Sequence, residues 1–282
     1  MNTNKLGAKI YKLQKMLRET KSAVVAYSGG VDSSLLLYAA RRVLGRDNVL
    51  AVIANSPTLP SEELNFARRF ARSQDANFLI IKTNEFSDEN FRLNSAKRCY
   101  YCKKELFGNC RRIAKLRGYR RVLCGANYDD KADYRPGMRA AREYKIRSPL
   151  AEVKLTKEEI RRISKALGLV THDKPQQACL SSRIPYFEEI TVEKLGRIER
   201  AERYLRRLGF AEVRVRHHEG IARIELGNGA IKKFLDNNLR IKTARRLKQL
   251  GFNWVALDME GYRQGSMNRA IERKVQSEKR KV

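Results

Sequence analysis

The sequence predicts an α/β protein in which a mostly parallel sheet with helices on both faces precedes a smaller α+β domain. Three observations carry this prediction. Short apolar runs alternate with helical stretches over residues 1–170, a Ser-Gly-Gly turn joins the first apolar run to the next helix, and the pattern changes after residue 170. Strands that alternate with helices form βαβ units, which place the strands parallel to one another.

The first domain is expected over residues 1–170. Its predicted strands are 23–26, 49–54, 78–81 and 122–124, and its predicted helices are 6–20, 31–44, 61–72 and 103–116. The strands are continuous apolar runs, which is typical of a sheet covered on both faces. A further helix should begin after Thr156, because Thr156-Lys157-Glu158-Glu159 has the pattern of a capping box.

The second domain is expected over residues 171–262. It should contain a helix over 191–208, paired strands over 213–216 and 221–226, a helix over 230–250 and a last strand over 254–257. The two paired strands alternate in polarity around His217-His218-Glu219-Gly220. Residues 263–282 are basic and weakly patterned, and are predicted to form a C-terminal tail.

The composition excludes several classes of protein. The chain has 282 residues, 42% of them hydrophobic, and 60 Lys and Arg against 31 Asp and Glu, a net charge of +29. This apolar content is too high for a disordered chain, and no apolar run is long enough to span a membrane. Five cysteines and no signal-peptide pattern exclude a disulfide scaffold and favour the cytoplasm.

The positive net charge is compatible with more than one class of protein. It would suit an RNA-binding enzyme, an enzyme with anionic small-molecule substrates, or a proteome that favours charged surfaces. The basic residues are spread along the whole chain, which makes nucleic acid a less favoured partner.

The strongest motif is Ser28-Gly29-Gly30-Val31-Asp32-Ser33-Ser34, between a predicted strand and a predicted helix. Two glycines allow a tight turn whose N–H groups approach an anion, and the helix dipole adds positive potential. The three serines supply hydroxyl donors, and Asp32 could hold a Mg²⁺ bound to phosphates. The motif is neither a Walker loop nor a dinucleotide fingerprint. The alternative is a purely structural turn in which these residues only cap the helix.

The cysteines form a second pattern. Cys99-Tyr100-Tyr101-Cys102 lies at a helix start, and Cys179 follows 77 residues later. The pair alone could be a redox pair, half of a zinc site or two unremarkable thiols. Cys110 and Cys124 have apolar neighbours and are interpreted as buried small hydrophobic residues. Three cysteines would fit a 4Fe–4S cluster with one open iron, which could hold an additional sulfide.

Cys179 has polar surroundings of its own, in Gln176-Gln177-Ala178-Cys179-Leu180-Ser181-Ser182-Arg183. A segment rich in serine and arginine favours the thiolate and can bind a phosphorylated or adenylated substrate. The alternative is a structural cysteine in a loop.

The loop at 28–34 resembles the PP-loop of the N-type ATP pyrophosphatases, which cleave ATP between its α and β phosphates. Further segments make the resemblance specific: the chain resembles the LarE family of ATP-dependent pyridinium-3,5-biscarboxylate mononucleotide sulfurtransferases. The segments that carry it are Asn55-Ser56-Pro57, Arg98-Cys99, Gly125-Ala126-Asn127-Tyr128-Asp129-Asp130, Arg147-Ser148-Pro149-Leu150, Ala178-Cys179-Leu180-Ser181-Ser182-Arg183-Ile184-Pro185 and Val213-Arg214-Val215-Arg216-His217-His218.

This resemblance implies that the chain helps to make the nickel-pincer nucleotide, by adenylating a substrate carboxylate and converting it to a thiocarboxylate. One branch of the family consumes the sulfur of a single cysteine and leaves dehydroalanine. The other branch holds a 4Fe–4S cluster on three cysteines and reuses added sulfide. Cys179 falls where the sacrificial cysteine falls, and Cys99 and Cys102 match the additional pair of the cluster branch, which the chain therefore resembles.

The resemblance also implies a set of roles and partners. ATP and Mg²⁺ would bind at Ser28, Gly29, Gly30, Asp32, Ser33 and Ser34, with Asn55 and Gly125 near the adenosine. Arg214 and Arg216, which share one strand face, would bind the substrate phosphate, assisted by Tyr100, Ser182 and Arg183. Glu202 and Glu225 resemble residues linked to a metal. The expected partners are a small nucleotide substrate, sulfide or another sulfur donor, and further copies of the chain in a homo-oligomer.

Two other functions fit part of the pattern. A tRNA thiolation enzyme would combine a PP-loop, cysteines and a cluster with a basic surface, although no appended RNA-binding module precedes the loop. A non-catalytic PP-loop module would bind a nucleotide or RNA without turnover, against which the intact Ser28, Asp32 and Ser33 argue.

Overall fold

The computed structural model of the protein describes residues 3–131, 136–227, 229–263 and 267. Its contacts divide the chain into two compact units. The first unit comprises Met1–Asp88 and Cys99–Gln177, and the second comprises Glu89–Arg98 and Ala178–Val282. The contacts therefore assign residues 171–177 to the first unit, beyond the predicted boundary near 170. They also assign an earlier segment, residues 89–98, to the second unit. Most of the predicted tail over 263–282 lies outside the described residues.

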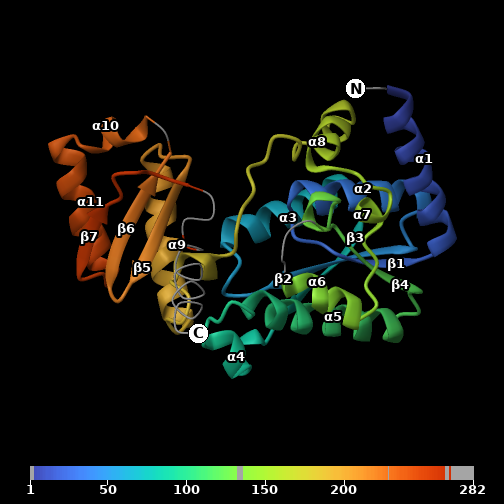
Figure 1. The fold of residues 1–282 in the computed structure, drawn as a ribbon, viewed down its shortest axis with the longest axis horizontal. Helices are drawn as coiled ribbons and strands as arrows, with labels where there is room; N and C mark the ends of the chain where they lie inside the picture. The colour runs from blue at the N-terminus through green and yellow to red at the C-terminus, as the bar shows by residue number, and fades with distance from the viewer. Residues whose placement is uncertain (1–2, 132–135, 228, 264–266, 268–282) are drawn as a thin grey trace, which may run out of the picture. The chain divides into compact units, whose positions relative to one another are not determined.

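A four-stranded sheet forms the centre of the first unit, with the strand order β3-β2-β1-β4 (Figure 1). The strands are β1 (Ala23–Ala26), β2 (Val49–Asn55), β3 (Asn77–Lys82) and β4 (Arg121–Cys124). All three pairings are parallel, as the alternation of strands and helices predicted. Because the strands are parallel, their carboxyl ends meet at one edge of the sheet, where α/β folds bind ligands.

Helices cover both faces of this sheet. Alternate residues of each strand point to opposite sides, so each face has an apolar surface of its own that a helix layer buries. Val25 and Ile53 belong to one buried cluster, and Val24 and Val52 belong to another. The first cluster includes side chains of α1 (Thr3–Thr20), α2 (Val31–Leu44), α3 (Ser61–Ser73), α7 (Pro149–Glu152) and α8 (Lys157–Ala166). The second includes side chains of α5 (Arg98–Leu116) and α6 (Pro136–Glu143). Both faces are therefore sealed from water, which confirms the predicted arrangement.

The second unit contains a three-stranded sheet of order β5-β6-β7. Strands β5 (Val213–His218) and β6 (Ile221–Leu226) are antiparallel, as predicted, and β7 (Trp254–Leu257) runs parallel to β6. Helix α9 (Val192–Arg207) packs on β5.

The prediction of one helix over 230–250 was wrong. The chain forms α10 (Ala230–Phe234) and α11 (Asn237–Gln249), separated at Asp236. The carboxylate of Asp236 accepts a hydrogen bond from the backbone N–H of Leu239 at 3.0 Å, so it caps a new helix and interrupts the old one.

Residues 89–98 leave the first unit and pack within the second. They contain the short helix α4 (Glu89–Arg92) and the fully buried Asn94. The amide of Asn94 donates to the carbonyl oxygen of Pro185 at 2.6 Å, and the N–H of Phe187 donates to the carbonyl of Asn94 at 3.1 Å. This excursion, residues 89–98, is followed at once by α5, which begins at Arg98 rather than at the predicted Lys103.

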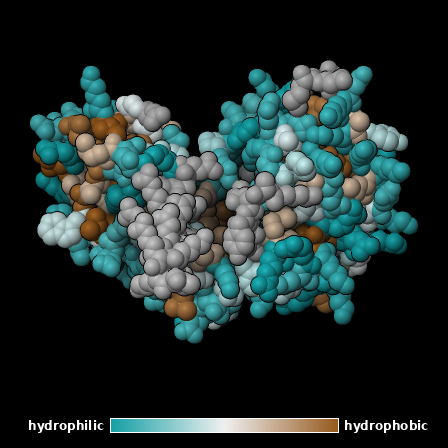
Figure 2. All heavy atoms as spheres, in the orientation of Figure 1, coloured by the Kyte–Doolittle hydropathy of each residue, from teal (hydrophilic) through white to brown (hydrophobic). Residues whose placement is uncertain are grey.

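The visible face of the first unit carries mostly hydrophilic side chains, and that of the second shows hydrophilic and hydrophobic side chains together (Figure 2). The chain as a whole is 32% charged. Among the described residues, no helix is both long enough and apolar enough to cross a membrane.

Candidate functional site

The Ser-Gly-Gly turn connects β1 to α2 at the carboxyl edge of the parallel sheet. Gly29 has φ +75°, a left-handed conformation that side chains other than glycine rarely adopt. A Cβ atom on Gly29 would also lie 3.1 Å from the Cβ of Ala67. Gly30 is the N-cap of α2 and makes no side-chain cap, so the first turn of the helix has N–H groups available for an anion.

Two of the three loop serines gather at this turn. The hydroxyl oxygens of Ser28 and Ser33 lie 3.1 Å apart, and the Ser33 hydroxyl donates to the carbonyl of Gly30. The hydroxyl of Ser34, by contrast, is fully buried and lies 3.3 Å from that of Tyr27. The structure therefore brings Ser28 and Ser33 together at the loop and directs the side chain of Ser34 into the core.

Asp32 points a carboxylate into the loop region from the first turn of α2. Its Oδ2 lies 2.7 Å from the ammonium of Lys157, and its Oδ1 is buried with no hydrogen-bond partner among the described residues. Burial raises the pKa of Asp32, while the hydrogen bond and charge of Lys157 oppose that rise. A buried carboxylate oxygen without a donor fits a hard cation, so these residues suit a Mg²⁺ ion carried in with phosphates.

Lys157 is a residue of this site that the sequence analysis did not identify. It is the first residue of α8, which starts with the predicted capping box: both Thr156–Glu159 hydrogen bonds are present. The backbone N–H of Lys157 also donates to the carboxylate of Asp129 at 2.8 Å. The cap and this bond fix the start of α8, so that the side chain of Lys157 reaches the loop.

Gly125 lies directly against the loop from the end of β4. A Cβ atom there would lie 2.7 Å from both the backbone nitrogen and the Cα of Ser33. Only glycine allows this approach, so Gly125 lets the end of β4 pack on the start of α2. Asn55 is exposed at the end of β2, on the same edge of the sheet.

Lys174 is a second residue that the sequence analysis missed. Its ammonium donates to the carbonyl of Gly29 at 3.0 Å, pairs with Glu63 at 2.7 Å and lies 3.6 Å from the ring centroid of Phe66. Burial lowers the pKa of Lys174, opposed by the Glu63 carboxylate. The segment that leads to Cys179 is thus attached to the phosphate loop five residues earlier.

The cysteines fall into two groups. Cys110 and Cys124 are buried, as predicted, and burial raises the pKa of Cys110 to about 12, so its thiol stays protonated at neutral pH. Cys99 is exposed and Cys102 half-buried near the start of α5, and Cys179 is exposed in the second unit. Among the residues that the structure describes, no three His, Cys, Asp or Glu side chains are grouped to hold a metal ion.

Tyr100 lies between Cys99 and Cys102 near the start of α5. Its hydroxyl donates to Glu143 at 2.7 Å, and the guanidinium of Arg139 lies 5.2 Å from its ring centroid. Both partners belong to α6, so Tyr100 connects the start of α5 to that helix.

In the second unit, the Cys179 loop, residues 178–183, ends in the fully buried Arg183. Its guanidinium makes two hydrogen bonds to Glu202, at 2.8 and 3.2 Å, and donates to the carbonyls of Ala178 and Cys179 at 2.6 and 3.0 Å. Glu202 is fully buried, also pairs with Arg206 and accepts from the N–H of Val215. Although burial alone would raise the pKa of Glu202, the surrounding arginines hold it below its ordinary value.

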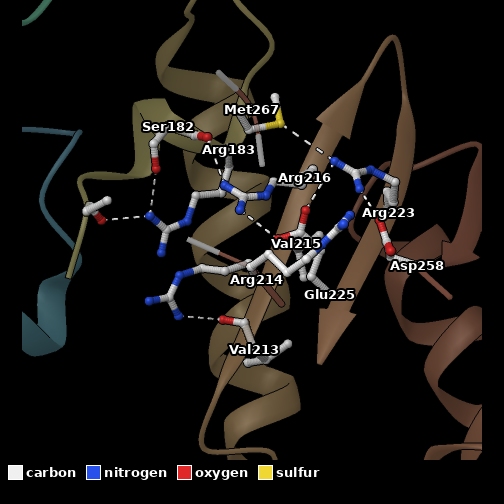
Figure 3. A network of polar contacts seen from close by, with 12 residues as sticks. Ser182, Arg183, Val213, Arg214, Val215, Arg216, Arg223, Glu225, Asp258 and Met267 are labelled. Carbon is white, nitrogen blue, oxygen red and sulfur yellow. Dashed lines mark hydrogen bonds and ion pairs between the residues drawn. The ribbon is translucent and has the colours of Figure 1, made fainter. Parts of the chain in front are cut away.

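Arg214 and Arg216 extend from β5 beside this network (Figure 3). Arg216 pairs with Glu225 at 2.6 Å and donates to the carbonyl of Ser182 at 2.9 Å. Arg214 donates to the carbonyl of Val213 and lies 4.8 Å from the ring centroid of Tyr262, and no carboxylate of the described residues lies within ion-pair distance of it. Burial and the nearby positive charge of Arg183 lower the pKa of Arg214, so an anion would be stabilised there.

Glu202 and Glu225, expected from the resemblance to be linked to a metal, are both ion-pair partners of arginines here. Arg223 is a further partner of Glu225, at 3.2 Å. A carboxylate whose oxygens accept from guanidinium groups has less capacity for a cation. These contacts therefore give the two glutamates a structural explanation, and a metal role for them stays a prediction.

A parallel sheet that carries this loop at its carboxyl edge classifies the first unit as a PP-loop domain. Residues 8–106 match the family model described as NAD synthase. Over 266 residues the chain is 46% identical to an uncharacterized protein of Synechocystis, covering 94% of this chain and 99% of that protein. It is 32% identical over 258 residues to an uncharacterized protein of Methanocaldococcus jannaschii, covering 90% and 97%.

A third relative has a named activity. The chain is 40% identical over 263 residues to the pyridinium-3,5-bisthiocarboxylic acid mononucleotide synthase of Lactiplantibacillus plantarum, covering 93% of this chain and 95% of that protein. The chain belongs to the LarE family, within the PP-loop proteins.

Proposed function

We propose that the protein is an ATP-dependent sulfurtransferase of nickel-pincer cofactor biosynthesis. Its substrate would be pyridinium-3,5-biscarboxylic acid mononucleotide, one carboxylate of which becomes a thiocarboxylate. The observation that carries the proposal is the 40% identity to the named synthase, which extends over nearly the full length of both chains.

The first chemical step would be adenylation at the phosphate loop. A carboxylate oxygen of the substrate attacks the α-phosphorus of ATP, the bond to the β-phosphate breaks, and pyrophosphate leaves. Ser28, Ser33 and the N–H groups after Gly30 would bind the phosphates, and the unpartnered Oδ1 of Asp32 would ligate the accompanying Mg²⁺. The ammonium of Lys157 would neutralise charge that develops on the leaving pyrophosphate.

The second step would transfer sulfur. A sulfur nucleophile attacks the acyl carbon, the carbon–oxygen bond to AMP breaks, and AMP leaves with the bonding electrons. In the favoured route, Cys99, Cys102 and Cys179 would hold a 4Fe–4S cluster, which would supply a renewable sulfide for this attack. The exposure of Cys99 and Cys179 supports their use as thiolate ligands. In the alternative route, Cys179 itself attacks and then loses its sulfur by β-elimination, becoming dehydroalanine.

The second unit would bind the nucleotide substrate. Arg214 is the guanidinium best able to take its phosphate, because it is buried and has no carboxylate partner within the described part of the chain. Arg216, Ser182 and Arg183 complete the proposed substrate residues of this unit, and Tyr100 of the first unit is a further proposed substrate residue.

The proposal is tested by separating the two steps in Cys179→Ala. Substrate-dependent pyrophosphate release should persist at the wild-type rate, because adenylation needs the phosphate loop and the substrate carboxylate but no thiol. Thiocarboxylate formation, followed by mass spectrometry, should be lost. Cys110→Ala is the matched control: that thiol is buried, so the variant should keep both steps even if it is less stable. Thiocarboxylate formation by Cys179→Ala would refute the role of Cys179.

The same assay separates the other candidate functions. Pyrophosphate release that depends on tRNA rather than on the pyridinium nucleotide would indicate a tRNA thiolation enzyme. No release with either substrate would indicate a binding module.

A further inference from the structure

The side chain of Lys174 joins the segment that follows α8 to the phosphate loop. Its ammonium donates to the carbonyl oxygen of Gly29 at 3.0 Å and to the carboxylate of Glu63 at 2.7 Å. It also lies 3.6 Å from the ring centroid of Phe66, and the side chain is only 13% exposed. All four residues belong to the first unit. The adenylation step proposed above gives this largely buried cation no role.

Packing does not account for the charge of Lys174. Glu63 and Phe66 belong to α3, whose Ala67 leaves little room for a Cβ atom on Gly29. An apolar side chain at position 174 could contact Phe66 without removing an ammonium and a carboxylate from water, a cost that their mutual attraction does not always repay. What the ammonium adds, beyond its pair with Glu63, is the hydrogen bond to the Gly29 carbonyl.

The peptide bond that Lys174 holds lies between two glycines. Gly29 has φ +75°, and neither Gly29 nor Gly30 carries a Cβ atom, so this peptide can rotate at little steric cost. A rotation would reverse the directions of its carbonyl and its N–H, because the two point opposite ways in a trans peptide. A donor fixed on the Gly29 carbonyl therefore selects one orientation of the Gly30 N–H.

The selected orientation directs the Gly30 N–H to the side of the loop where the serine hydroxyls lie. The nitrogen of Gly30 is 3.5 Å from the hydroxyl oxygen of Ser28, which lies 3.1 Å from that of Ser33. Lys174 is bonded to the opposite side of the same peptide. Backbone N–H groups that are presented in this way at the start of a helix bind anions.

We infer that Lys174 is a positioning residue for phosphate binding: its bond to the Gly29 carbonyl holds the Gly30 N–H toward the phosphates of ATP. The inference rests on the proposed function, in which ATP binds at this loop. Lys174 differs in this from Lys157, whose ammonium would contact the phosphates themselves. Because Glu63 balances the charge of Lys174, the effect of Lys174 on the phosphates comes through the backbone.

The test compares Lys174→Met, Lys174→Arg and the control Lys165→Met, which removes an exposed lysine of α8. Isothermal titration measures the binding of Mg·ATP, Mg·pyrophosphate and adenosine to each protein. ATP and pyrophosphate should bind about tenfold more weakly to Lys174→Met, since the loop loses an oriented donor to a charged group. Adenosine has no phosphate and should bind as it does to wild type. Lys174→Arg should recover part of the affinity, because a guanidinium can donate to the same carbonyl, and Lys165→Met should match wild type.

A second measurement follows the loop itself, by amide hydrogen exchange of residues 28–34 without ligand. Loss of one hydrogen bond should make this exchange about two- to tenfold faster in Lys174→Met. Exchange in β1 and β2 should stay unchanged. Faster exchange in those strands as well would reduce Lys174 to a support of the whole unit and would overturn the inference.

The binding data can overturn the inference in two further ways. Equal affinities of Lys174→Met and wild type for pyrophosphate would show that the carbonyl bond does not matter for the phosphates. Equal losses of adenosine and pyrophosphate binding would show a general defect of the site. Wild-type protein that binds Mg·ATP but forms no thiocarboxylate would instead refute the proposed function, and weaker pyrophosphate binding by Lys174→Met would then still support the positioning role.

Discussion

The ammonium of Lys157 lies 2.7 Å from the Oδ2 atom of Asp32, although 125 residues separate them along the chain. Asp32 belongs to the first turn of the helix after the phosphate loop, and Lys157 begins the helix that packs against it. The contact places a cation beside the anion-binding turn and leaves the other oxygen of Asp32 unbonded within the described residues. The ammonium of Lys157 can therefore leave the carboxylate of Asp32 and bind a phosphate group at the loop instead.

Replacing Lys157 with Met should weaken ATP binding by about tenfold to a hundredfold, since a charge-assisted hydrogen bond contributes about 1.5–3 kcal/mol. Isothermal titration with Mg·ATP measures this change. Lys165→Met, an exposed lysine on the same helix, is the control and should bind as wild type does. An unchanged affinity in Lys157→Met would show that Lys157 only neutralises Asp32.

Gly125→Ala should destabilise the first unit by about 1–3 kcal/mol, because the new Cβ overpacks against the backbone of Ser33. Pyrophosphate release should fall as well, since the loop must shift to make room. Gly7→Ala is the control: it lies in α1 with nothing within 4 Å of a new Cβ, and should stabilise the helix by about 0.5–1 kcal/mol. Thermal unfolding distinguishes the two variants, and equal melting temperatures would contradict the close approach of β4 to the loop.

Acidification should destabilise the second unit through Glu202. The folded state holds the pKa of Glu202 below its ordinary 4.5. As the pH falls through 4.5, the unfolded chain takes up a proton before the folded chain does, so the free energy of unfolding decreases toward the folded pKa. Above 4.5 the contribution is fully present. The single tryptophan, Trp254, lies in β7, so its fluorescence during denaturation can follow this unit.

Glu202→Gln should remove this pH dependence. It should also lower the free energy of unfolding at pH 7 by about 3–5 kcal/mol, because Arg183 would lose its buried counter-ion. Glu199→Gln, one turn earlier on the same helix, provides a comparison at another carboxylate of α9. If the slope with pH is the same in wild type and Glu202→Gln, another carboxylate is responsible.

Arg214 and Arg216 should respond differently to substitution by Met. Arg214→Met should raise the KM for the nucleotide substrate by about tenfold or more and leave the melting temperature near that of wild type, since it breaks no ion pair. Arg216→Met should lower the melting temperature, because Glu225 and the Ser182 carbonyl lose a donor. ATP binding should be intact in both variants. Identical effects of the two substitutions would mean that the two arginines share one role.

The parallel sheet and the phosphate loop could be predicted from the sequence because their signals are local. Each strand of the first unit is a contiguous apolar run, and Ser28 to Ser34 form one uninterrupted motif. The capping box at Thr156 is equally local, and it formed as predicted.

The parts that could not be predicted depend on contacts between distant residues. Nothing near Lys157 or Lys174 in the sequence indicates that either reaches the loop. The sequence contains a weak signal for the helix break at Asp236, because Asp-Asn-Asn is a favourable helix start. This signal lies inside an otherwise helical pattern, which predicted one continuous helix. The motif predicted a phosphate-binding hydroxyl at Ser34, but packing of α2 places this side chain in the core, where its hydroxyl contacts that of Tyr27.

The excursion has a consequence for the order in which the protein can fold during its synthesis. Residues 89–98 leave the ribosome about ninety residues before Ile184, Pro185 and Phe187, on which Asn94 depends for its hydrogen bonds. Asn94 must therefore wait, solvated, until the later segment emerges. A gene fragment starting at Ala178 would encode the second unit without residues 89–98. A chimera that exchanges this unit between relatives must therefore transfer both stretches together.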